Sequence, residues 1–206
     1  MSTCYIVGAG ELARLPHREA GDLIIAADGG LDGLLAGGIL PDLLIGDMDS
    51  KSRDFSGETI VFPVRKDETD SFLAYREGVK RGYRDFVLLG GTGGREDHTF
   101  ANISLLLYAK KQGHSVKMIG KQNSYSVILD GEDVFSGEAL SHISVFALGG
   151  NAEGVTVRGA EYEAENITLT PEYPLGASNR FVGEPVFISV ERGALLIITE
   201  NTASQN

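Results

Sequence analysis

The sequence predicts an α/β fold in two parts: a Rossmann-like parallel-sheet domain over residues 1–121, followed by an antiparallel β-sandwich domain over residues 122–206. Two observations support this division. Up to Lys121, short and almost continuously apolar runs alternate with helical patterns, which is typical of strands buried on both faces of a parallel sheet. After Lys121 the helical period disappears, and Gly, Asn, Asp and Pro turns separate short apolar runs, which indicates antiparallel strands.

Strands of the first domain are expected where aliphatic or β-branched residues run together and Gly, Asp or Pro follows. These runs are Tyr5–Val7, Leu23–Ala27, Leu43–Ile45, Thr59–Phe62, Phe86–Leu89 and Val116–Ile119. Helices are predicted over Asp70–Arg81 and His98–Gln112, because apolar residues recur at helical spacing and a glycine follows each segment.

The second domain is expected to contain only strands. The predicted strands are Ser126–Leu129, Ile143–Leu148, Ile167–Thr170, Val186–Val190 and Leu195–Thr199. No flexible linker separates the two halves, so we expect them to pack directly. Ligand sites occur often at such junctions, so a site there is expected too.

Composition restricts the function. The net charge of −11 argues against a nucleic-acid partner, because phosphate backbones are bound by neutralising them with Lys and Arg. Cys4 is the only cysteine and the histidines are scattered, which excludes an intrachain disulfide and disfavours a zinc site. An oxygen-ligated cation such as Mg²⁺ is the metal to expect. No apolar run approaches the roughly 20 residues needed to span a bilayer, and no signal peptide opens the chain, so we expect a cytoplasmic protein without a membrane partner.

Acidic residues follow the predicted strands. In LLIGDMDS, residues 43–50, the apolar run ends in Asp47 and Asp49, and Asp28 follows the preceding strand. Open parallel sheets bind ligands outside the carboxyl ends of their strands. Side chains two apart on an extended segment point the same way, so Asp47 and Asp49 can present their carboxylates to one Mg²⁺ ion. A solvated turn explains one Asp-x-Asp, but not the recurrence of acids and glycines at one edge.

Two other segments lie between a predicted strand and a helix. The glycine-rich GGTGGREDH, residues 90–98, offers backbone N–H groups and a helix N-terminus to a phosphate, and Arg95 is suited to stabilising phosphate charge. It lacks the Gly-Lys-Ser/Thr ending of a Walker A loop. The acidic KDETD, residues 66–70, offers Asp67 or Thr69 as a helix cap, whereas Asp70 is a candidate metal ligand.

One competing motif lies near the start of the chain. IVGAGELA, residues 6–13, is similar to the Gly-x-Gly-x-x-Ala dinucleotide-binding fingerprint, and Asp28 falls near the distance of a ribose-binding acid. Pro16, however, would lie inside the helix that this motif requires and is expected to break it. The motif also leaves the acids after the other strands unexplained.

Taken together, these segments resemble the thiamine pyrophosphokinase family. The likeness rests on ADGG at 27–30, PDLLIGDMDS at 41–50, KDETD at 66–70 and LLGGTGGREDHTFANI at 88–103. It continues with GVTVRGAEY at 154–162, GASNRF at 176–181 and ERGALLII at 191–198. The motifs cover both halves of the chain in the order that the family shows.

The resemblance implies a thiamine diphosphokinase that transfers the intact diphosphate of ATP to the hydroxyl of thiamine and releases AMP. It also implies a homodimer whose thiamine sites lie where the ATP-binding domain of one subunit meets the sandwich of the other. The implied Mg²⁺ ligands are Asp47, Asp49 and Asp70. The implied catalytic residues are Asp49, Asp70 and Arg95, with Asp70 as candidate acceptor of the hydroxyl proton. The implied ATP-binding residues are Asp28, Gly29, Gly91, Thr92, Gly94, Arg95, Asp97 and His98, and the implied thiamine-binding residues are Ser178 and Asn179.

The chain departs from the family at GAEYEA, residues 159–164, and has no Trp to stack on the thiamine rings. An aromatic contact would therefore come from Phe or Tyr, with Tyr162 and Phe181 as candidates. Two other functions stay open: a diphosphokinase acting on a pterin-like alcohol, and a non-enzymatic dinucleotide-binding regulator built on IVGAGELA. The sequence leaves the nucleotide preference and the kinetic order undetermined.

Overall fold

The fold of this chain was analysed in a computed structural model that describes residues 2–46, 55–63 and 67–201. The predicted metal ligands Asp47 and Asp49 lie outside these described residues. The chain divides into two compact units. Unit 1 comprises Met1–Leu105 and Gly113–Lys121, and unit 2 comprises Leu106–Gln112 and Gln122–Asn206.

Unit 1 is built on parallel strands. They are β1 (Thr3–Val7), β2 (Leu23–Ala27), β3 (Leu43–Gly46), β4 (Glu58–Val61), β5 (Asp85–Leu89) and β6 (Ser115–Ile119), in the order β6-β5-β1-β2-β3-β4. Central strand β1 pairs with β2 and β5, and its last residue, Val7, lies opposite Ala26 and Leu89. The carboxyl ends of these strands therefore meet at one edge, as the sequence predicts.

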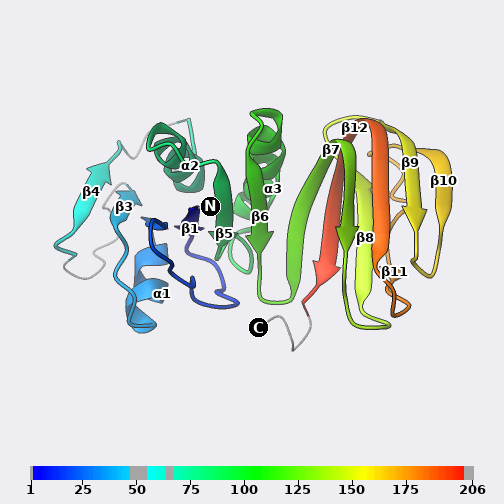
Figure 1. The fold of residues 1–206 in the computed structure, drawn as a ribbon. Coiled ribbons are helices and arrows are strands. Elements are labelled where there is room, and N and C mark those ends of the chain that lie inside the picture. Colours follow the sequence, from blue (N-terminus) through cyan, green and yellow to red (C-terminus); the bar gives the residue numbers. More distant parts are fainter. Residues whose placement is uncertain (1, 47–54, 64–66, 202–206) are drawn as a thin grey trace. The chain divides into compact units, whose positions relative to one another are not determined.

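Helices follow some of these strands (Figure 1). They are α1 (Gly30–Ala36), α2 (Asp70–Lys80) and α3 (Glu96–Lys111), and α2 and α3 are confirmed to within two residues of the predicted bounds. Helix α1 was not expected, because glycine is a poor helix former. A Cβ at Gly30 would lie 1.8 Å from the carbonyl oxygen of Val7, so α1 needs glycine to start this close to β1. No helix within the described ranges is both long and apolar enough to cross a membrane.

The core of unit 1 is mostly apolar, and it contains a buried polar pair. Strand β2 is buried along its whole length, as expected for a strand covered on both faces. The hydroxyl of Tyr75 on α2 lies 2.6 Å from Nδ1 of His114, and both residues are buried. Because Tyr75 lies on α2 and His114 directly precedes β6, the bond links α2 to the segment that leads into β6.

Unit 2 contains antiparallel strands, as predicted. They are β7 (Asn123–Phe135), β8 (His142–Ala147), β9 (Ala152–Arg158), β10 (Ala164–Leu169), β11 (Asn179–Arg180) and β12 (Val186–Glu200). Strand β12 pairs with β7 along most of its length, with β9 through its first half and with β8 through its second half. Strand β10 extends this arrangement from β9, and β11 extends it from β8.

The prediction for unit 2 was wrong in detail. The expected strands Val186–Val190 and Leu195–Thr199 form the single strand β12, and β9 and β11 were missed. The register of β12 against β7 shifts between Val190 and Ala194, where Gly193 has a φ of +108°. Oδ1 of Asp130 accepts a hydrogen bond of 2.7 Å from the Gly193 N–H. At this bulge, a hydrogen bond to a side chain therefore replaces a backbone hydrogen bond between the two strands.

The mixed α/β class is thus confirmed, and the description of unit 2 as a sandwich stays a prediction. One apolar cluster gathers buried side chains from β7, β8, β9, β10 and β12, together with Phe181. Phe181 is fully buried in this cluster.

Candidate active site

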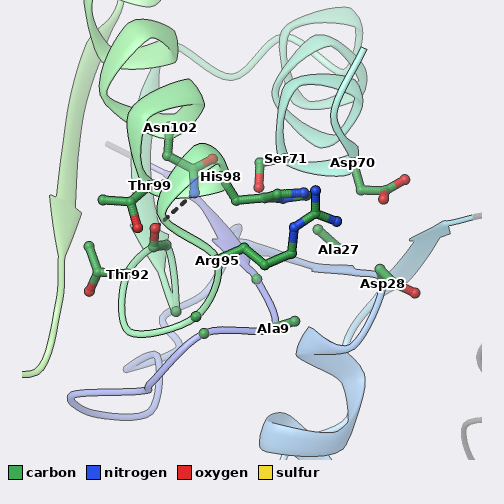
Figure 2. Close-up of a pocket in the computed structure, with 15 residues that line it drawn as sticks. Ala9, Ala27, Asp28, Asp70, Ser71, Thr92, Arg95, His98, Thr99 and Asn102 are labelled. Atoms are coloured by element: carbon green, nitrogen blue, oxygen red, sulfur yellow. Dashed lines mark hydrogen bonds between the residues drawn. The ribbon is translucent and has the colours of Figure 1, made fainter. Parts of the chain in front are cut away.

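A pocket of about 330 Å³ lies in unit 1 at the carboxyl edge of the parallel strands (Figure 2). Loops after β1, β2 and β5 and the first turns of α2 and α3 form its wall. The lining residues are Gly8, Ala9, Gly10, Ala27, Asp28, Asp70, Ser71, Gly90, Gly91, Thr92, Gly94, Arg95, His98, Thr99 and Asn102. Its volume falls in the range of small-molecule sites, and its position is that of ligand crevices in open α/β sheets.

The glycines of IVGAGELA bring the loop after β1 against the loop after β5. The N–H of Gly10 donates to the carbonyl of Gly90 and the N–H of Glu11 to that of Thr92, both at 2.8 Å. A Cβ at Gly10 would lie 2.1 Å from the Thr92 oxygen, so no other residue fits there. Residues 8–22 contain no helix, as Pro16 predicts. These glycines therefore allow loop packing and do not begin a dinucleotide-binding helix.

Three backbone carbonyl groups of the glycine-rich loop accept hydrogen bonds from other parts of the protein. Those of Gly90 and Thr92 accept from the loop after β1, and that of Gly91 accepts from Nδ2 of Asn102 at 2.9 Å. Within residues 2–46, 55–63 and 67–201, by contrast, no acceptor is bonded to the N–H groups of Thr92, Gly93 and Gly94. Uncommitted backbone donors beside the N-terminus of a sixteen-residue helix make a favourable environment for an anion.

Arg95 supplies the positive charge of this pocket. Its guanidinium binds the carboxylate of Asp97 through Nε at 3.1 Å and Nη2 at 2.6 Å. This pairing raises the pKa of Arg95 and lowers the pKa of Asp97, in both cases chiefly through the hydrogen bonds between them. Figure 2 shows the Arg95 side chain extending from the glycine-rich loop toward the side of the pocket that carries Asp28 and Asp70.

The carboxylates of Asp28 and Asp70 come from neighbouring parts of the edge. Asp28 directly follows β2 in a left-handed conformation with φ +47°, and its N–H donates to the Ile45 carbonyl at 2.7 Å. Asp70 is the first residue of α2, and the side chain of Thr69 caps that helix by accepting from the Phe72 N–H at 3.3 Å. Because Thr69 is the cap, Asp70 is not needed for that purpose.

These oxygen donors are of the kind that Mg²⁺ prefers. The described part of the chain contains no group of three or more His, Cys, Asp or Glu side chains placed to hold a metal. Mg²⁺ needs no such group, since it is commonly bound by one or two carboxylates, substrate phosphates and water. The donor set therefore fits a magnesium–nucleotide complex, with Asp70 as the described member of the predicted metal ligands.

Some of the predicted ATP-binding and metal-binding residues line the pocket, and others do not. Asp28, Asp70, Gly91, Thr92, Gly94, Arg95 and His98 line it, whereas Gly29 and Asp97 do not. Sequence reasoning missed Asn102, whose side chain is only 5% exposed and holds the glycine-rich loop. The available signal was its spacing: residues 98, 99 and 102 share one face of a helix.

The predicted thiamine residues lie in unit 2. Ser178 is exposed, in a left-handed conformation with φ +60°, and its N–H donates to Oγ of Ser144 at 3.1 Å. Asn179 is 8% exposed and hydrogen-bonded to the backbone of Tyr162. Tyr162 is 66% exposed and Phe181 is fully buried, so of these two aromatic candidates only Tyr162 presents its ring to solvent.

Two family models match consecutive parts of the chain. The model "Thiamin pyrophosphokinase, catalytic domain" matches residues 17–118, and "Thiamin pyrophosphokinase, vitamin B1 binding domain" matches residues 134–195. The chain belongs to the thiamin pyrophosphokinase family. The catalytic-domain match contains most of the pocket residues, and the vitamin B1 binding match contains Tyr162, Ser178 and Asn179.

Relatives in this family match over nearly the whole chain. The thiamine pyrophosphokinase of Bacillus subtilis (strain 168) is 29% identical over 210 residues, which cover 96% of this chain and 98% of the relative. A crystal structure of thiamine pyrophosphokinase from Bacillus subtilis has a TM-score of 0.85 and 27% identity, covering 97% of this chain and 99% of that one. The thiamin pyrophosphokinase structure from Geobacillus thermodenitrificans has a TM-score of 0.82 and 26% identity, with coverage of 99% and 100%.

Proposed function

We propose that the protein is an ATP-dependent thiamine diphosphokinase, which transfers the intact diphosphate of ATP to the hydroxyl of thiamine and releases AMP. Family membership supports the activity. The observation that carries the assignment of the site is the pocket of unit 1. Thr92 and Gly94, whose N–H groups are uncommitted, line it together with Arg95, Asp28 and Asp70.

ATP binds in this pocket. The polyphosphate lies against the glycine-rich loop, where the N–H groups of Thr92, Gly93 and Gly94 donate to its oxygens. Gly91 and His98 line the same wall, and Asp28 and Gly29 belong to the nucleotide side at the end of β2. Asp97 contributes to ATP binding by orienting the Arg95 guanidinium.

The reaction requires alignment and charge neutralisation. The thiamine hydroxyl oxygen forms a bond to the β-phosphorus of ATP, the bond from that phosphorus to the oxygen bridging it to the α-phosphorus breaks, and AMP leaves. Arg95 stabilises the charge that spreads over the phosphoryl oxygens. Asp70 accepts the proton of the attacking hydroxyl.

Mg²⁺, held by Asp70 together with Asp47 and Asp49, neutralises phosphate charge when bound. Placing Asp70 at the first position of α2 keeps its carboxylate at the pocket wall while Thr69 satisfies the helix end.

Thiamine binds through residues of unit 2, in which Ser178 and Asn179 belong to its site. We further propose the domain division predicted above, with residues 1–121 binding ATP and a sandwich over 122–206 binding thiamine. The active form is a homodimer in the cytoplasm, with both subunits contributing to each thiamine site.

The test is to incubate the purified protein with ATP, Mg²⁺ and thiamine and to resolve the products by chromatography. AMP appearing in step with thiamine diphosphate is the expected result. ADP with thiamine monophosphate would place the attack on the γ-phosphorus and refute the diphosphate transfer. Absence of any thiamine product, with turnover of a pterin-like alcohol, would refute the substrate assignment.

A further inference from the structure

The side chain of Asn179 is occupied by the backbone of its own unit. Oδ1 accepts from the N–H groups of Tyr162 and Arg180, each at 2.9 Å, and Nδ2 donates to the carbonyl of Tyr162 at 2.7 Å. With 8% exposure, the amide is enclosed, and both its oxygen and its nitrogen have partners. Both acceptor positions of Oδ1 are therefore filled, and only one N–H of Nδ2 remains for a ligand.

These bonds belong to a set that fixes one loop. In the segment of residues 159–163, Oε1 of Glu163 accepts from the Gly159 N–H at 2.6 Å, and the Glu161 N–H donates to the Arg180 carbonyl at 3.0 Å. Ala160 forms an antiparallel bridge with Phe181. The segment is therefore attached to β11 and the residue after it at Ala160, Glu161 and Tyr162.

The Tyr162 side chain projects from this fixed backbone. Its exposure of 66% contrasts with the full burial of Phe181. Glu161 and Glu163 are its neighbours in the chain, but the Glu161 carboxylate lies 4.0 Å from Nε of Arg180 and that of Glu163 accepts from Gly159. Ser178, next to Asn179 in the chain, is exposed in a left-handed backbone conformation. An exposed aromatic face attracts an organic cation, and a ring whose backbone is fixed loses little freedom on binding.

We propose that Asn179 is a positioning residue, which acts on thiamine binding by holding Tyr162, and that the Tyr162 ring contacts the cationic thiazolium ring. This inference rests on the proposed function. It changes the role that the resemblance implies for Asn179 from a thiamine ligand to a support, and it selects Tyr162 from the aromatic candidates.

A double-mutant cycle on the full chain tests the proposal. The variants are Tyr162→Ala, Asn179→Ala and their combination, with the KM for thiamine, the KM for ATP, kcat and the free energy of unfolding measured for each. Each single variant is expected to raise the KM for thiamine about tenfold, as expected for loss of a partly desolvated cation–π contact. The combination is expected to be no worse than the more affected single variant, and the KM for ATP stays unchanged. Tyr173→Ala is the matched control, because Tyr173 is 67% exposed in the same unit.

The proposal would be overturned if the combined variant raised the KM for thiamine by the product of the two single fold-increases. Asn179 would then bind thiamine independently of Tyr162. An unchanged KM for thiamine in a folded Asn179→Ala protein would also overturn it. If Asn179→Ala does not fold, Asn179→Asp takes its place, since it keeps the acceptor for the Tyr162 N–H and replaces the donor to the Tyr162 carbonyl by a negatively charged oxygen that repels it. Failure of the proposed function would appear separately, as a wild-type protein that makes no thiamine diphosphate.

Discussion

A buried asparagine holds a loop in each of the two units, but the loops leave different groups for a ligand. Asn102 binds the carbonyl of Gly91, and the neighbouring carbonyls accept from the loop after β1, so backbone N–H donors remain at the pocket wall. Asn179 binds both the N–H and the carbonyl of Tyr162, so only the Tyr162 side chain remains. The first arrangement suits an anion and the second a cationic ring, which matches the chemistry of ATP and thiamine.

The largest effect is expected at Asp70, which lines the pocket together with residues of the glycine-rich loop. Asp70→Asn should lower kcat by about 10³-fold, because it removes a magnesium ligand and the proton acceptor while leaving the Thr69 cap in place. The measurement is kcat at saturating ATP, thiamine and Mg²⁺. Asp32→Asn is the control, since Asp32 also lies in the first turn of a helix but outside the pocket. A kcat for Asp70→Asn within tenfold of the wild type would remove Asp70 from the mechanism.

A second change separates the loop after β1 from the glycine-rich loop after β5. Gly10→Ala would place a Cβ 2.1 Å from the Thr92 carbonyl oxygen, and we expect the KM for ATP to rise more than about tenfold with a loss of about 2 kcal/mol in the free energy of unfolding. Gly38→Ala provides the contrast. Gly38 has a φ of +75° and open space around it, so this variant should lose stability without any change in the KM for ATP. Equal effects of both variants on that KM would show that loop packing does not shape the site.

Asn102 in unit 1 is the counterpart of Asn179 in unit 2. Asn102→Ala should raise the KM for ATP about fivefold, because the loss of one buried hydrogen bond leaves the Gly91 carbonyl free to turn. The KM for thiamine should stay unchanged, which is the reverse of the result expected for Asn179→Ala. Steady-state kinetics with each substrate varied in turn measure both constants. If either variant raised the KM for ATP and the KM for thiamine to the same extent, this would contradict the assignment of ATP binding to unit 1 and thiamine binding to unit 2.

The smallest effect concerns the pH dependence of stability, in which unit 1 should respond to acid before unit 2. Burial, and to a smaller extent Arg84, lowers the pKa of His114 from its usual 6.5. The unfolded chain therefore takes up this proton at a higher pH than the folded chain, so stability is complete above pH 6.5 and declines as the pH falls below it. In unit 2, hydrogen bonds from His142 lower the pKa of Glu200 from 4.5, so that contribution is present above pH 4.5 and is lost as the pH falls through the lowered value.

Urea unfolding between pH 4 and pH 8 measures this difference. His114→Gln should flatten the decline that begins below pH 6.5, because glutamine carries no titratable proton and can still accept from Tyr75. His142→Gln should change the curve only at the acid end. A decline in His114→Gln as steep as in the wild type would exclude His114 as its cause.

The elements whose signals are local could be predicted from the amino-acid sequence. Continuous apolar runs marked the strands of unit 1, and apolar spacing ending at Gly82 and Gly113 marked α2 and α3. The acids and glycines after these runs predicted where a ligand would bind, because parallel strands end at one edge of their sheet. Pro16 was enough to exclude a dinucleotide-binding helix after β1.

The tertiary structure alone decided features that depend on contacts distant in sequence. Helix α1 was not predicted because glycines are poor helix formers, and Gly30 is needed for the close approach of α1 to β1. The strand β12 was divided in the prediction because a bulge at Gly193 resembles a turn until Asp130 is seen to bridge it. The hydrogen-bond partners of Asn102 and Asn179 could not be predicted either. In a sequence, an asparagine whose amide binds a ligand cannot be distinguished from one whose amide binds the backbone of another segment. Burial and hydrogen-bond partners distinguish these cases, and both arise only when the chain has folded.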